Sequence, residues 1–421
     1  MLTFQLRFKN TPYIYGLLLI FTLLLSLSRI RAGDDDKLTP QETIEYHYKQ
    51  FTQKIKNAPD EAQNEIDNQV LTIIEELFDL NRLASQVLQN QWARMNNYEQ
   101  MKFAEAFKIS LHHKILSQIG LDKNKRLPSL KFESIKTNNN VSTLNYLVSF
   151  EKKKKELTLY MLKYPDGSWR ISNLKTDNKS LLRHYYSYCN KITKKFSLAY
   201  LIAELSNSDY VLLEDFESGE VGKLPVGWLW KKSDEKKNKP YKISLEDGNK
   251  YLKAEDTGES VILGKDINWD LKKYPYISFR WRVHELPAGG DERYGKTVDS
   301  AAGIYIIYKK KLGLIPESVK YVWSTTLPVG STMKRSGIGK PWNIVAESGD
   351  EHLGEWRTYV FNAYEAYEKT FGGKPPRKPV GIGLLSDANS THSKAYADYD
   401  DIRALKQADV DSGVKQILDA E

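Results

Sequence analysis

The sequence predicts two domains, an α+β domain followed by an all-β domain built as a sandwich or jelly roll. A chain of 421 residues exceeds what one ordinary hydrophobic core holds. Helical periodicity and then strand alternation fill the first half, whereas nearly every apolar segment after Asp209 alternates like a strand. With 41% hydrophobic and 12% aromatic residues, the composition is that of a globular protein.

Charge and cysteine content exclude several classes of function. The net charge of +8 is modest for this length, and no zinc-finger spacing, RNP-like segment or long basic helix supports nucleic-acid binding. Lysine runs such as residues 152–155 and 309–311 predict solvated turns and strand edges, and a basic patch for anionic headgroups is the alternative. The single cysteine, Cys189, cannot form a disulfide within the chain, so we expect a small buried apolar residue there.

Residues 1–33 have the features of a secretory signal. Arg7 and Lys9 precede an apolar run at residues 13–27, and small residues follow it as far as Ala32. The run is shorter than the about 20 residues that a membrane span needs. We expect cleavage after Ala32, with an uncleaved inner-membrane anchor as the alternative. No cysteine follows the run, which excludes a lipid-anchored lipoprotein.

Helical periodicity begins at Thr39-Pro40, a dipeptide that can open a helix. Apolar residues recur on one face as far as Ile55, and Pro59 marks a break. A second helix is expected to carry the apolar residues of the segment 66–77.

Residues 77–120 predict two amphipathic helices with heavy apolar stripes. The first begins after Asp79, a candidate N-cap, and ends near Trp92. In the second, Asn97 can act as the N-cap with Gln100 as its capping-box partner. Its apolar residues fall on one face: Phe103, Phe107, Leu111 and Ile115. We expect the rest of the domain to cover this stripe or to leave an apolar hollow beneath it.

Strand alternation replaces helical periodicity after Gly120. Strands are expected near residues 144–150, 157–162 and 169–174, and Pro165-Asp166-Gly167 predicts a hairpin turn between the last two. One final helix, from about Ser180 to Leu205, completes an α+β layout. His112 and His113 are adjacent on a helix and point about 100° apart, so we expect surface residues rather than a metal pair.

Three segments of this half resemble the MlaC-type periplasmic phospholipid-binding proteins, the soluble component of a lipid-trafficking ABC system. They are residues 78–92, residues 98–107, and the strand 169–174 with the helix start 180–185. The chain departs from the family pattern at three motif positions: Asn173, Asn178 and Tyr186. The resemblance covers residues 38–206.

This resemblance implies helices and a curved antiparallel sheet that enclose a deep apolar cavity, with acyl chains inside and the headgroup near solvent. It singles out the following candidate lipid-binding residues: Phe78, Leu83, Val87, Trp92, Phe103, Phe107, Leu111, Tyr160 and Trp169. An ordinary packed core is the alternative for all of them. The implied ligand is a phospholipid, and the implied partners are inner- and outer-membrane lipid-transport complexes in the periplasm.

The second domain is expected at residues 210–406, because the segment 205–209 breaks the helix, and residues 407–421 form a C-terminal tail. Short strands are expected near residues 211–217, 251–254, 261–263, 276–283, 303–308, 319–324, 356–361, 379–385 and 395–405. A helix interrupts the series at residues 363–371. The number and short spacing of these strands predict the sandwich or jelly roll.

An ordered set of segments in this half resembles a bacterial envelope domain of unknown function, family 3047. The set comprises residues 224–228, 277–283, 290–291, 381–387 and 397–402, with Asp299, Ala301-Ala302, Tyr305, Trp323 and Asn389 between them. Because no activity is established for that family, the resemblance implies a domain but no reaction.

Two polar groups in the second domain could carry chemistry. Arg280 and Arg282 share one face of a strand, and Trp281 lies on the other. A buried arginine pair needs acidic partners, for which the candidates are Asp291, Asp299 and Asp387. A second group offers oxygen ligands: Asp387, Asn389, Asp398, Asp400 and Asp401. Paired carboxylates can hold Ca²⁺ or act as acid and base on a glycan, and turn and strand-end capping is the alternative.

The leading hypothesis is a secreted, non-enzymatic protein of a Gram-negative envelope that binds and shuttles phospholipid. Its C-terminal domain would recognise a second envelope component, a glycan or a partner protein. An envelope glycan-processing enzyme with its site on the sandwich is the second hypothesis, and a pair of protein-interaction modules is the third. We expect no catalytic residue, metal or cofactor, because the sequence contains no EF-hand, P-loop, GxSxG or HExxH pattern.

Overall fold

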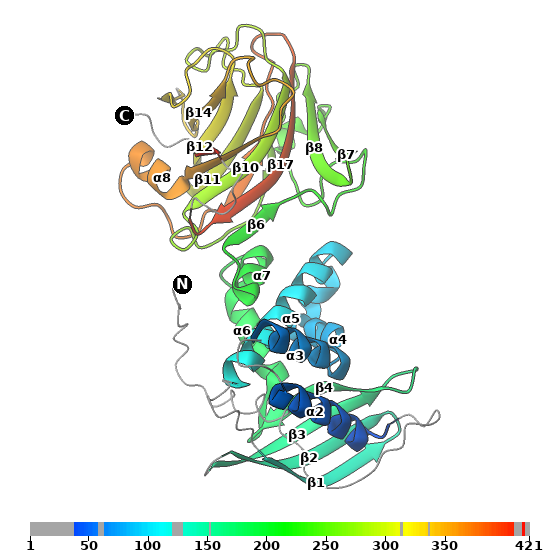
Figure 1. Ribbon diagram of the computed structural model, residues 1–421. Coiled ribbons are helices and arrows are strands. Elements are labelled where there is room, and N and C mark those ends of the chain that lie inside the picture. Colours follow the sequence, from blue (N-terminus) through cyan, green and yellow to red (C-terminus); the bar gives the residue numbers. More distant parts are fainter. Residues whose placement is uncertain are drawn as a thin grey trace. The chain divides into compact units, whose positions relative to one another are not determined.

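The computed structural model describes residues 38–57, 63–119, 129–150, 153–311, 315–335, 337–407 and 415–416 (Figure 1). The expected signal at residues 1–33 and nearly all of the expected tail at residues 407–421 lie outside the described residues. Packing divides the chain into two compact units. One comprises the chain up to Met95 and residues 100–191, and the other comprises Asn96–Glu99 and the chain from Ile192 onward. Among the described residues, no helix is long and apolar enough to cross a membrane.

Helices α2 to α6 supply most of the first unit. Their bounds are α2 (Pro40–Asn57), α3 (Gln63–Leu77), α4 (Leu80–Leu88), η2 (Gln89–Arg94), α5 (Asn97–Ile119) and α6 (Leu181–Thr193). The predicted cap of α4 is confirmed, because the Asp79 carboxylate accepts a hydrogen bond from the Arg82 amide at 3.1 Å. Thr39 opens α2 as predicted, with its hydroxyl accepting from the Glu42 amide at 3.2 Å.

The cap of α5 differs from the predicted one. Asn96, rather than Asn97, accepts a hydrogen bond from the Glu99 amide at 2.9 Å, and the Glu99 carboxylate accepts from the Asn96 amide at 3.0 Å. The predicted partner, Gln100, donates instead to the Trp92 carbonyl at 3.0 Å. Two successive asparagines offer the same capping chemistry, so local sequence cannot choose between the two registers.

Five antiparallel strands form the sheet of the first unit in the order β1-β2-β3-β4-β5. They are β1 (Ser129–Asn138), β2 (Val141–Phe150), β3 (Lys153–Lys163), β4 (Trp169–Thr176) and β5 (Lys179–Ser180). The turn predicted at Pro165-Asp166-Gly167 joins β3 to β4, and Gly167 supplies its positive φ of 85°. β1 was not predicted, because its polar sequence alternates weakly.

Helices cover one face of this sheet, with α2 over β2 and with α3 and α4 over β4 (Figure 1). The covered face carries alternating buried residues: Leu144, Tyr146 and Val148 of β2, Leu157, Leu159 and Met161 of β3, and Trp169, Ile171 and Leu174 of β4. The helices contribute their own buried stripes, including Leu83 and Val87 of α4. The interior of the first unit is therefore an apolar layer between helices and a single sheet.

The second unit contains α7 (Leu198–Ser206), η3 (Lys232–Asp234), α8 (Ala363–Phe371) and two sheets. One sheet runs β18-β15-β10-β17-β8-β7, with β6 paired to β17, and the other runs β13-β14-β12-β11-β16-β9. The strands are β6 (Tyr210–Glu214), β7 (Tyr241–Glu246), β8 (Asn249–Asp256), β9 (Leu263–Lys265), β10 (Tyr276–Glu285), β11 (Ala302–Lys311), β12 (Ile315–Ser324), β13 (Thr332–Lys334), β14 (Trp342–Ser348), β15 (Arg357–Asn362), β16 (Gly381–Leu384), β17 (Ala395–Leu405) and β18 (Lys415–Gln416). Most neighbouring strands are antiparallel, but β12–β14 and β15–β18 are parallel pairs.

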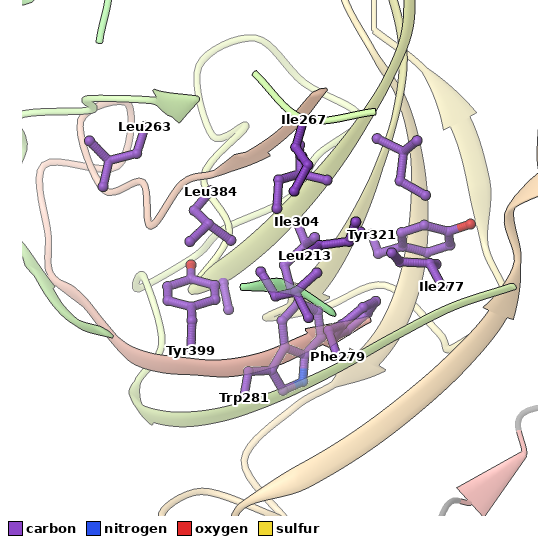
Figure 2. Packing of buried hydrophobic residues seen from close by; sticks show 14 of the residues in the cluster. Leu213, Leu263, Ile267, Ile277, Phe279, Trp281, Ile304, Tyr321, Leu384 and Tyr399 are labelled. Carbon is purple, nitrogen blue, oxygen red and sulfur yellow. The ribbon is translucent and has the colours of Figure 1, made fainter. Parts of the chain in front are cut away.

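The two sheets of the second unit bury their facing sides in one hydrophobic core (Figure 2). Phe279 and Trp281 of β10 pack against Tyr321 and Trp323 of β12, with ring centroids 5.8 and 6.3 Å apart. Tyr399 of β17 joins them and is fully buried. Because successive side chains of a strand point to opposite faces, the intervening residues of β10, β12 and β17 lie on the outer faces of the sheets.

The single helix predicted from Ser180 to Leu205 is two helices. α6 ends at Thr193, and α7 starts after Ser197, whose hydroxyl accepts a hydrogen bond from the Tyr200 amide at 3.3 Å. Tyr200 is part of the hydrophobic core of the second unit, so packing groups α7 with that unit. By packing, the two units divide between α6 and α7, which is one helix before the boundary predicted at residues 205–209.

Candidate functional site

The residues predicted to bind lipid lie mostly in the apolar layer of the first unit. Those that are buried, each no more than 5% exposed, are Phe78, Leu83, Val87, Phe103, Phe107, Leu111 and Trp169. Phe78 forms a bridge with Ile171 of β4, which attaches the start of α4 to the sheet. Trp92 is half-buried, and the side chain of Ile115 lies outside the described residues.

A series of aromatic rings runs from η2 along α5 to α6. Trp92 contacts Phe103 edge-on at 6.3 Å, Phe103 stacks with Phe107 at 6.4 Å, and Phe107 meets Tyr185 edge-on at 4.8 Å. Tyr185 was not predicted as a site residue, although it belongs to the helix start that resembles the MlaC-type family. Burial raises its pKa, and its hydroxyl lies 3.3 Å from the Ser110 hydroxyl.

A half-buried basic pair, Lys114 and His184, lies at the end of the apolar stripe of α5. Lys114 falls eleven residues after Phe103, on nearly the same face of α5, and its ammonium lies 2.8 Å from His184 Nε2. Burial lowers the pKa of Lys114 to about 8. Burial, together with the charge of Lys114, lowers the pKa of His184 to about 4. A cation next to an apolar stripe suits an amphiphilic ligand with a phosphate.

The apolar face of the sheet extends to its edge at β1. Ile135 of β1 pairs with Leu144 of β2 and therefore points to the same, helix-covered side. Leu144 is fully buried, whereas Ile135 is 41% exposed. Phe132, opposite Tyr146 in the same strand pair, is half-buried. The apolar layer thus reaches solvent along β1.

Tyr160 lies on the other face of the sheet and does not line the apolar layer. Its neighbours Leu159 and Met161 are fully buried under the helices, and strand alternation points Tyr160 away from them. Lys175 places its ammonium 5.1 Å from the Tyr160 ring on that opposite face. The period of two along β3 was visible in the sequence and could have predicted this placement.

In the second unit, the two predicted arginines lie on the outer face of the seven-stranded sheet. The register of β10 with β17 pairs Arg280 with Asp400 and Arg282 with Asp398. Asp398, 1% exposed, accepts from Arg282 Nε at 2.9 Å and contacts His284 Nε2 at 2.7 Å. The acidic partners are therefore Asp400 and Asp401 for Arg280, and Asp398 and Glu246 for Arg282. They are not the predicted candidates Asp291, Asp299 and Asp387. Local sequence could not show a register between strands more than a hundred residues apart.

Trp356 completes this group, although no sequence pattern singled it out. The guanidinium carbons of Arg280 and Arg282 lie 4.4 and 4.7 Å from the centre of its ring, and Tyr251 packs against it edge-on. Burial raises the pKa of Asp400 to about 6, although the charge of Arg280 opposes this shift. The arginines, the carboxylates and Trp356 contact one another, and among the described residues only Arg280 Nε and Asp398 Oδ1 of Arg280, Arg282, Asp398 and Asp400 are buried without a hydrogen-bond partner.

The remaining predicted polar residues are not all brought together. Asp291 forms a local ion pair with Arg293 at 2.7 Å, Asn389 is exposed, and Asp401 binds Arg403 at 2.8 Å. Asp299 and Asp387 are both buried, and burial raises the pKa of Asp387, with the charge of Lys320 opposing this shift and the charge of Asp299 adding to it. Among the described residues, no group of three or more His, Cys, Asp and Glu side chains is placed to hold a metal ion.

The sequence analysis considered three further residues of the first unit: His112, His113 and Cys189. His113 is exposed and His112 half-buried, and their ring centroids are 6.1 Å apart. Cys189 is buried as expected, and burial raises the pKa of its thiol to about 12, so the thiol stays protonated at neutral pH.

Comparisons with known proteins match two successive regions of the chain, and the first match includes α7, which packs with the second unit. Residues 47–207 match a model of the MlaC protein family, and residues 227–403 match a protein family of unknown function, DUF3047. The two matches follow one another along the chain in the order that the sequence motifs predicted.

One solved structure that aligns with the chain is a phospholipid-binding protein from Ralstonia solanacearum in complex with a phospholipid. The alignment has 17% identity and a TM-score of 0.35, and it covers 40% of this chain and 94% of that chain. No curated protein matches the chain.

Proposed function

We propose that the first unit binds a phospholipid and shuttles it across the periplasm for a lipid-transport system that includes an ABC transporter. The observation that carries this proposal is the MlaC-family match at residues 47–207, which spans the buried aromatic series and the inward face of the sheet. The protein acts without catalysing a reaction, and the second unit serves as a recognition module for another envelope component.

Acyl chains would insert between the helices and the sheet at the β1 edge. Ile135 and Phe132 present apolar surface to solvent there, on the side of the sheet that the helices cover elsewhere. Each methylene removed from water contributes about 0.8 kcal/mol, so two acyl chains supply ample affinity for tight binding. Release then requires a partner that binds an open form of the unit more tightly than the closed one.

The phosphate of the headgroup would lie near Lys114. This ammonium follows the apolar stripe of α5, and with a pKa of about 8 it is mostly protonated at neutral pH. His184, with a pKa of about 4, is neutral and can hydrogen-bond the ligand without adding charge.

Native mass spectrometry of protein purified from the periplasm, with the lipids extracted and identified, tests this function. We expect co-purifying phospholipid, and the mass of the mature chain also reports whether cleavage follows Ala32. A mass without lipid, together with no uptake from phospholipid vesicles, would contradict the proposal.

A matched pair of variants locates the binding site. Ile135→Lys places a charge at the β1 edge on the inward face, whereas Val141→Lys places one at a similarly exposed position, 41% against 48%, on the outer face. We expect Ile135→Lys to reduce lipid loading several-fold and Val141→Lys to leave it unchanged. Equal loading of both variants would place the ligand elsewhere.

A further inference from the structure

Residues 221–229, the strap, join the edge strands of the two sheets of the second unit. The Gly222 amide donates to the Ile243 carbonyl of β7 at 2.8 Å. Leu229 and Gly264 of β9 exchange backbone hydrogen bonds of 2.8 and 2.7 Å. Because β7 ends one sheet and β9 ends the other, the strap is held at a sheet edge on both sides.

The strap has a buried side and an apolar exposed side. Pro225 and Trp228 are buried, and Gly227 between them supplies a positive φ of 78°. Val226 is 53% exposed and Leu229 is 63% exposed, and Val221 at the start of the strap is 50% exposed. A single exposed aliphatic side chain is ordinary, but three of them on one short segment form an apolar patch in contact with water.

An amphipathic ring follows the strap directly. Trp230 is half-buried, and its indole Nε1 donates to the Glu235 carboxylate at 2.8 Å. The Lys239 ammonium lies 4.7 Å from the centre of its ring. A tryptophan with an apolar body and a hydrogen-bonded polar tip is typical of the boundary between lipid and water.

The chain around the strap is rich in lysine. Residues 220–242 contain seven lysines, no arginine and three acids, which gives a net charge of +4. Asp234 pairs with Lys237 at 3.1 Å, and Glu255 of β8 pairs with Lys242 at 2.9 Å. Four other lysines of this segment are exposed and form no ion pair among the described residues: Lys223, Lys231, Lys232 and Lys236.

Acids that contact this segment from neighbouring parts of the chain do not cancel its charge. Glu214 pairs with Lys265 at 2.8 Å, and Glu255 also pairs with Lys253 at 2.8 Å. The backbone carbonyl of Glu259 accepts from Lys237, which brings a third acid close to the segment. Adding these three acids and two lysines to residues 220–242 leaves a net charge of +3.

Lysine without arginine indicates the kind of partner. Protein interfaces favour arginine and are depleted of lysine, and recognition of a single phosphate or carboxylate uses the bidentate guanidinium. A layer of anionic headgroups instead attracts ammonium groups without fixed geometry. Aliphatic and tryptophan side chains beside such lysines insert at the boundary between headgroups and acyl chains.

We propose that the strap and residues 230–239 dock the second unit on a bilayer that contains anionic phospholipid. Val226, Leu229 and Trp230 enter the interface of the bilayer. The ammonium groups lie among the headgroups: Lys231, Lys232 and Lys236. The proposal rests on the second unit acting as a recognition module, and it is independent of lipid binding by the first unit.

Vesicle flotation of the full chain tests the proposal, with vesicles of phosphatidylcholine alone and of phosphatidylcholine mixed with phosphatidylglycerol. We expect the chain to bind the mixed vesicles about a hundredfold more tightly, since three lysines each contribute about fivefold on an anionic surface. Added salt should weaken this binding, because it screens the charges. Equal affinity for both kinds of vesicle would overturn the proposal. So would binding of polyglutamate without binding of vesicles, which would indicate an acidic protein as the partner.

A triple variant assigns the binding to the segment. Lys231→Gln, Lys232→Gln and Lys236→Gln together should lower the affinity for mixed vesicles about a hundredfold. The matched control removes three exposed lysines of the second unit outside the segment and should bind as the wild type does: Lys272→Gln, Lys296→Gln and Lys374→Gln. The substituted side chains are all exposed, so both variants should fold. Equal affinity of the two triple variants would overturn the proposal.

A second pair of variants tests the insertion of the strap. Leu229→Ser should weaken vesicle binding about tenfold, because it removes an apolar side chain from the interface. Val329→Ser, which also shortens an exposed aliphatic side chain, 43% exposed, should leave binding unchanged. Equal effects of the two would overturn the insertion. Native mass spectrometry of the same samples reports the lipid content of the chain. A chain that lacks phospholipid but floats with mixed vesicles would contradict the proposed function and support docking.

Discussion

The two units of this protein build their interiors differently. The first covers one sheet with helices, and its apolar layer reaches solvent at β1, where Ile135 is 41% exposed. The second packs two sheets against one another, and the core between them contains fully buried aromatic residues such as Phe279 and Trp281 (Figure 2). An interior with an open edge can admit a hydrophobic ligand, whereas one closed by its own side chains cannot. Binding chemistry in the second unit is therefore confined to its outer surfaces.

The outer faces of the two sheets of the second unit carry different arrangements of buried charged groups. On the seven-stranded sheet, Arg282 and His284 both bind Asp398, so the buried charge is paired within the protein. On the six-stranded sheet, the ammonium of Lys320 donates to the Ser300 hydroxyl at 3.4 Å, and the charges of Asp387, Glu292 and Asp299 oppose the burial that lowers its pKa. Both sheets therefore hold opposite charges near their buried charged groups, through direct ion pairs on the seven-stranded sheet and over longer distances on the six-stranded sheet.

Removing a ring from the closed core should give the largest loss of stability. Trp281 is fully buried and packs against Phe279, Tyr359 and Trp323. We expect Trp281→Ala to lower the free energy of unfolding by about 3–5 kcal/mol, because it leaves a cavity that the sheets cannot close. Urea unfolding of the full chain, followed by circular dichroism, measures the change.

The control for Trp281→Ala lies at the open edge of the first unit. Phe132→Ala removes a half-buried ring and should cost about 1 kcal/mol. Similar losses for the two variants would show that the two interiors are equally closed and would remove the contrast between them.

Breaking the paired network should have the next largest effect. Asp398→Asn keeps the shape of the side chain but removes the charge that binds Arg282 and His284. We expect a loss of about 2–3 kcal/mol in the free energy of unfolding, because hydrogen bonds to charged groups are lost in a buried setting. Thermal and urea unfolding of the full chain check this value.

Asp291→Asn is the matched control for Asp398→Asn. Its carboxylate binds Arg293 in an exposed local turn, so solvent replaces the lost interaction and stability should barely change. If both variants lose the same amount, the outer face of the seven-stranded sheet does not depend on its buried carboxylate.

The smallest effect expected is a pH dependence of lipid binding. The pKa of Lys114 is about 8, below the ordinary value of 10.5, so the ammonium loses its proton as the pH rises from 7 to 9. Binding of an anionic phospholipid should weaken over that interval, because the phosphate loses its cation. Equilibrium binding of a fluorescent phosphatidylglycerol between pH 6.5 and 9 measures it.

The burial of Lys114 also makes stability depend on pH, and here the effect increases with pH instead of decreasing. Between pH 8 and 10.5 the unfolded chain keeps the Lys114 proton that the folded chain has lost, so the contribution of this group to stability rises with pH. Lys114→Met should abolish the pH dependence of both quantities. A pH profile of lipid binding that is identical in the variant would exclude Lys114 from the headgroup site.

Much of the local structure followed from the sequence. The stripe of Phe103, Phe107 and Leu111 lies on one buried face of α5, as its four-residue spacing requires, and the helix predicted at residues 363–371 is α8. The Asp79 cap and the hairpin at residues 165–167 formed where their side chains and glycine indicated. Such features depend on neighbours within a few residues, which the sequence displays directly.

The sequence alone could not predict which residues far apart in the chain lie next to one another. The partners of Arg280 and Arg282 depend on the register of β10 with β17, and Lys320 meets Asn343 only because β12 and β14 are parallel neighbours. The helix that periodicity predicts from Ser180 to Leu205 is divided between Thr193 and Ser197, and α7 after this break packs with a different unit.

By itself, then, the sequence determined many of the helices and strands, the apolar face of each, and the order of the two family matches, but it missed strands such as β1 and the break between α6 and α7. The tertiary structure decided which charges are paired, which polar atoms remain without partners, and where the apolar layer meets solvent. The physical reason is that periodicity and capping act over a few residues, whereas burial and ion pairing depend on contacts between segments far apart in the chain.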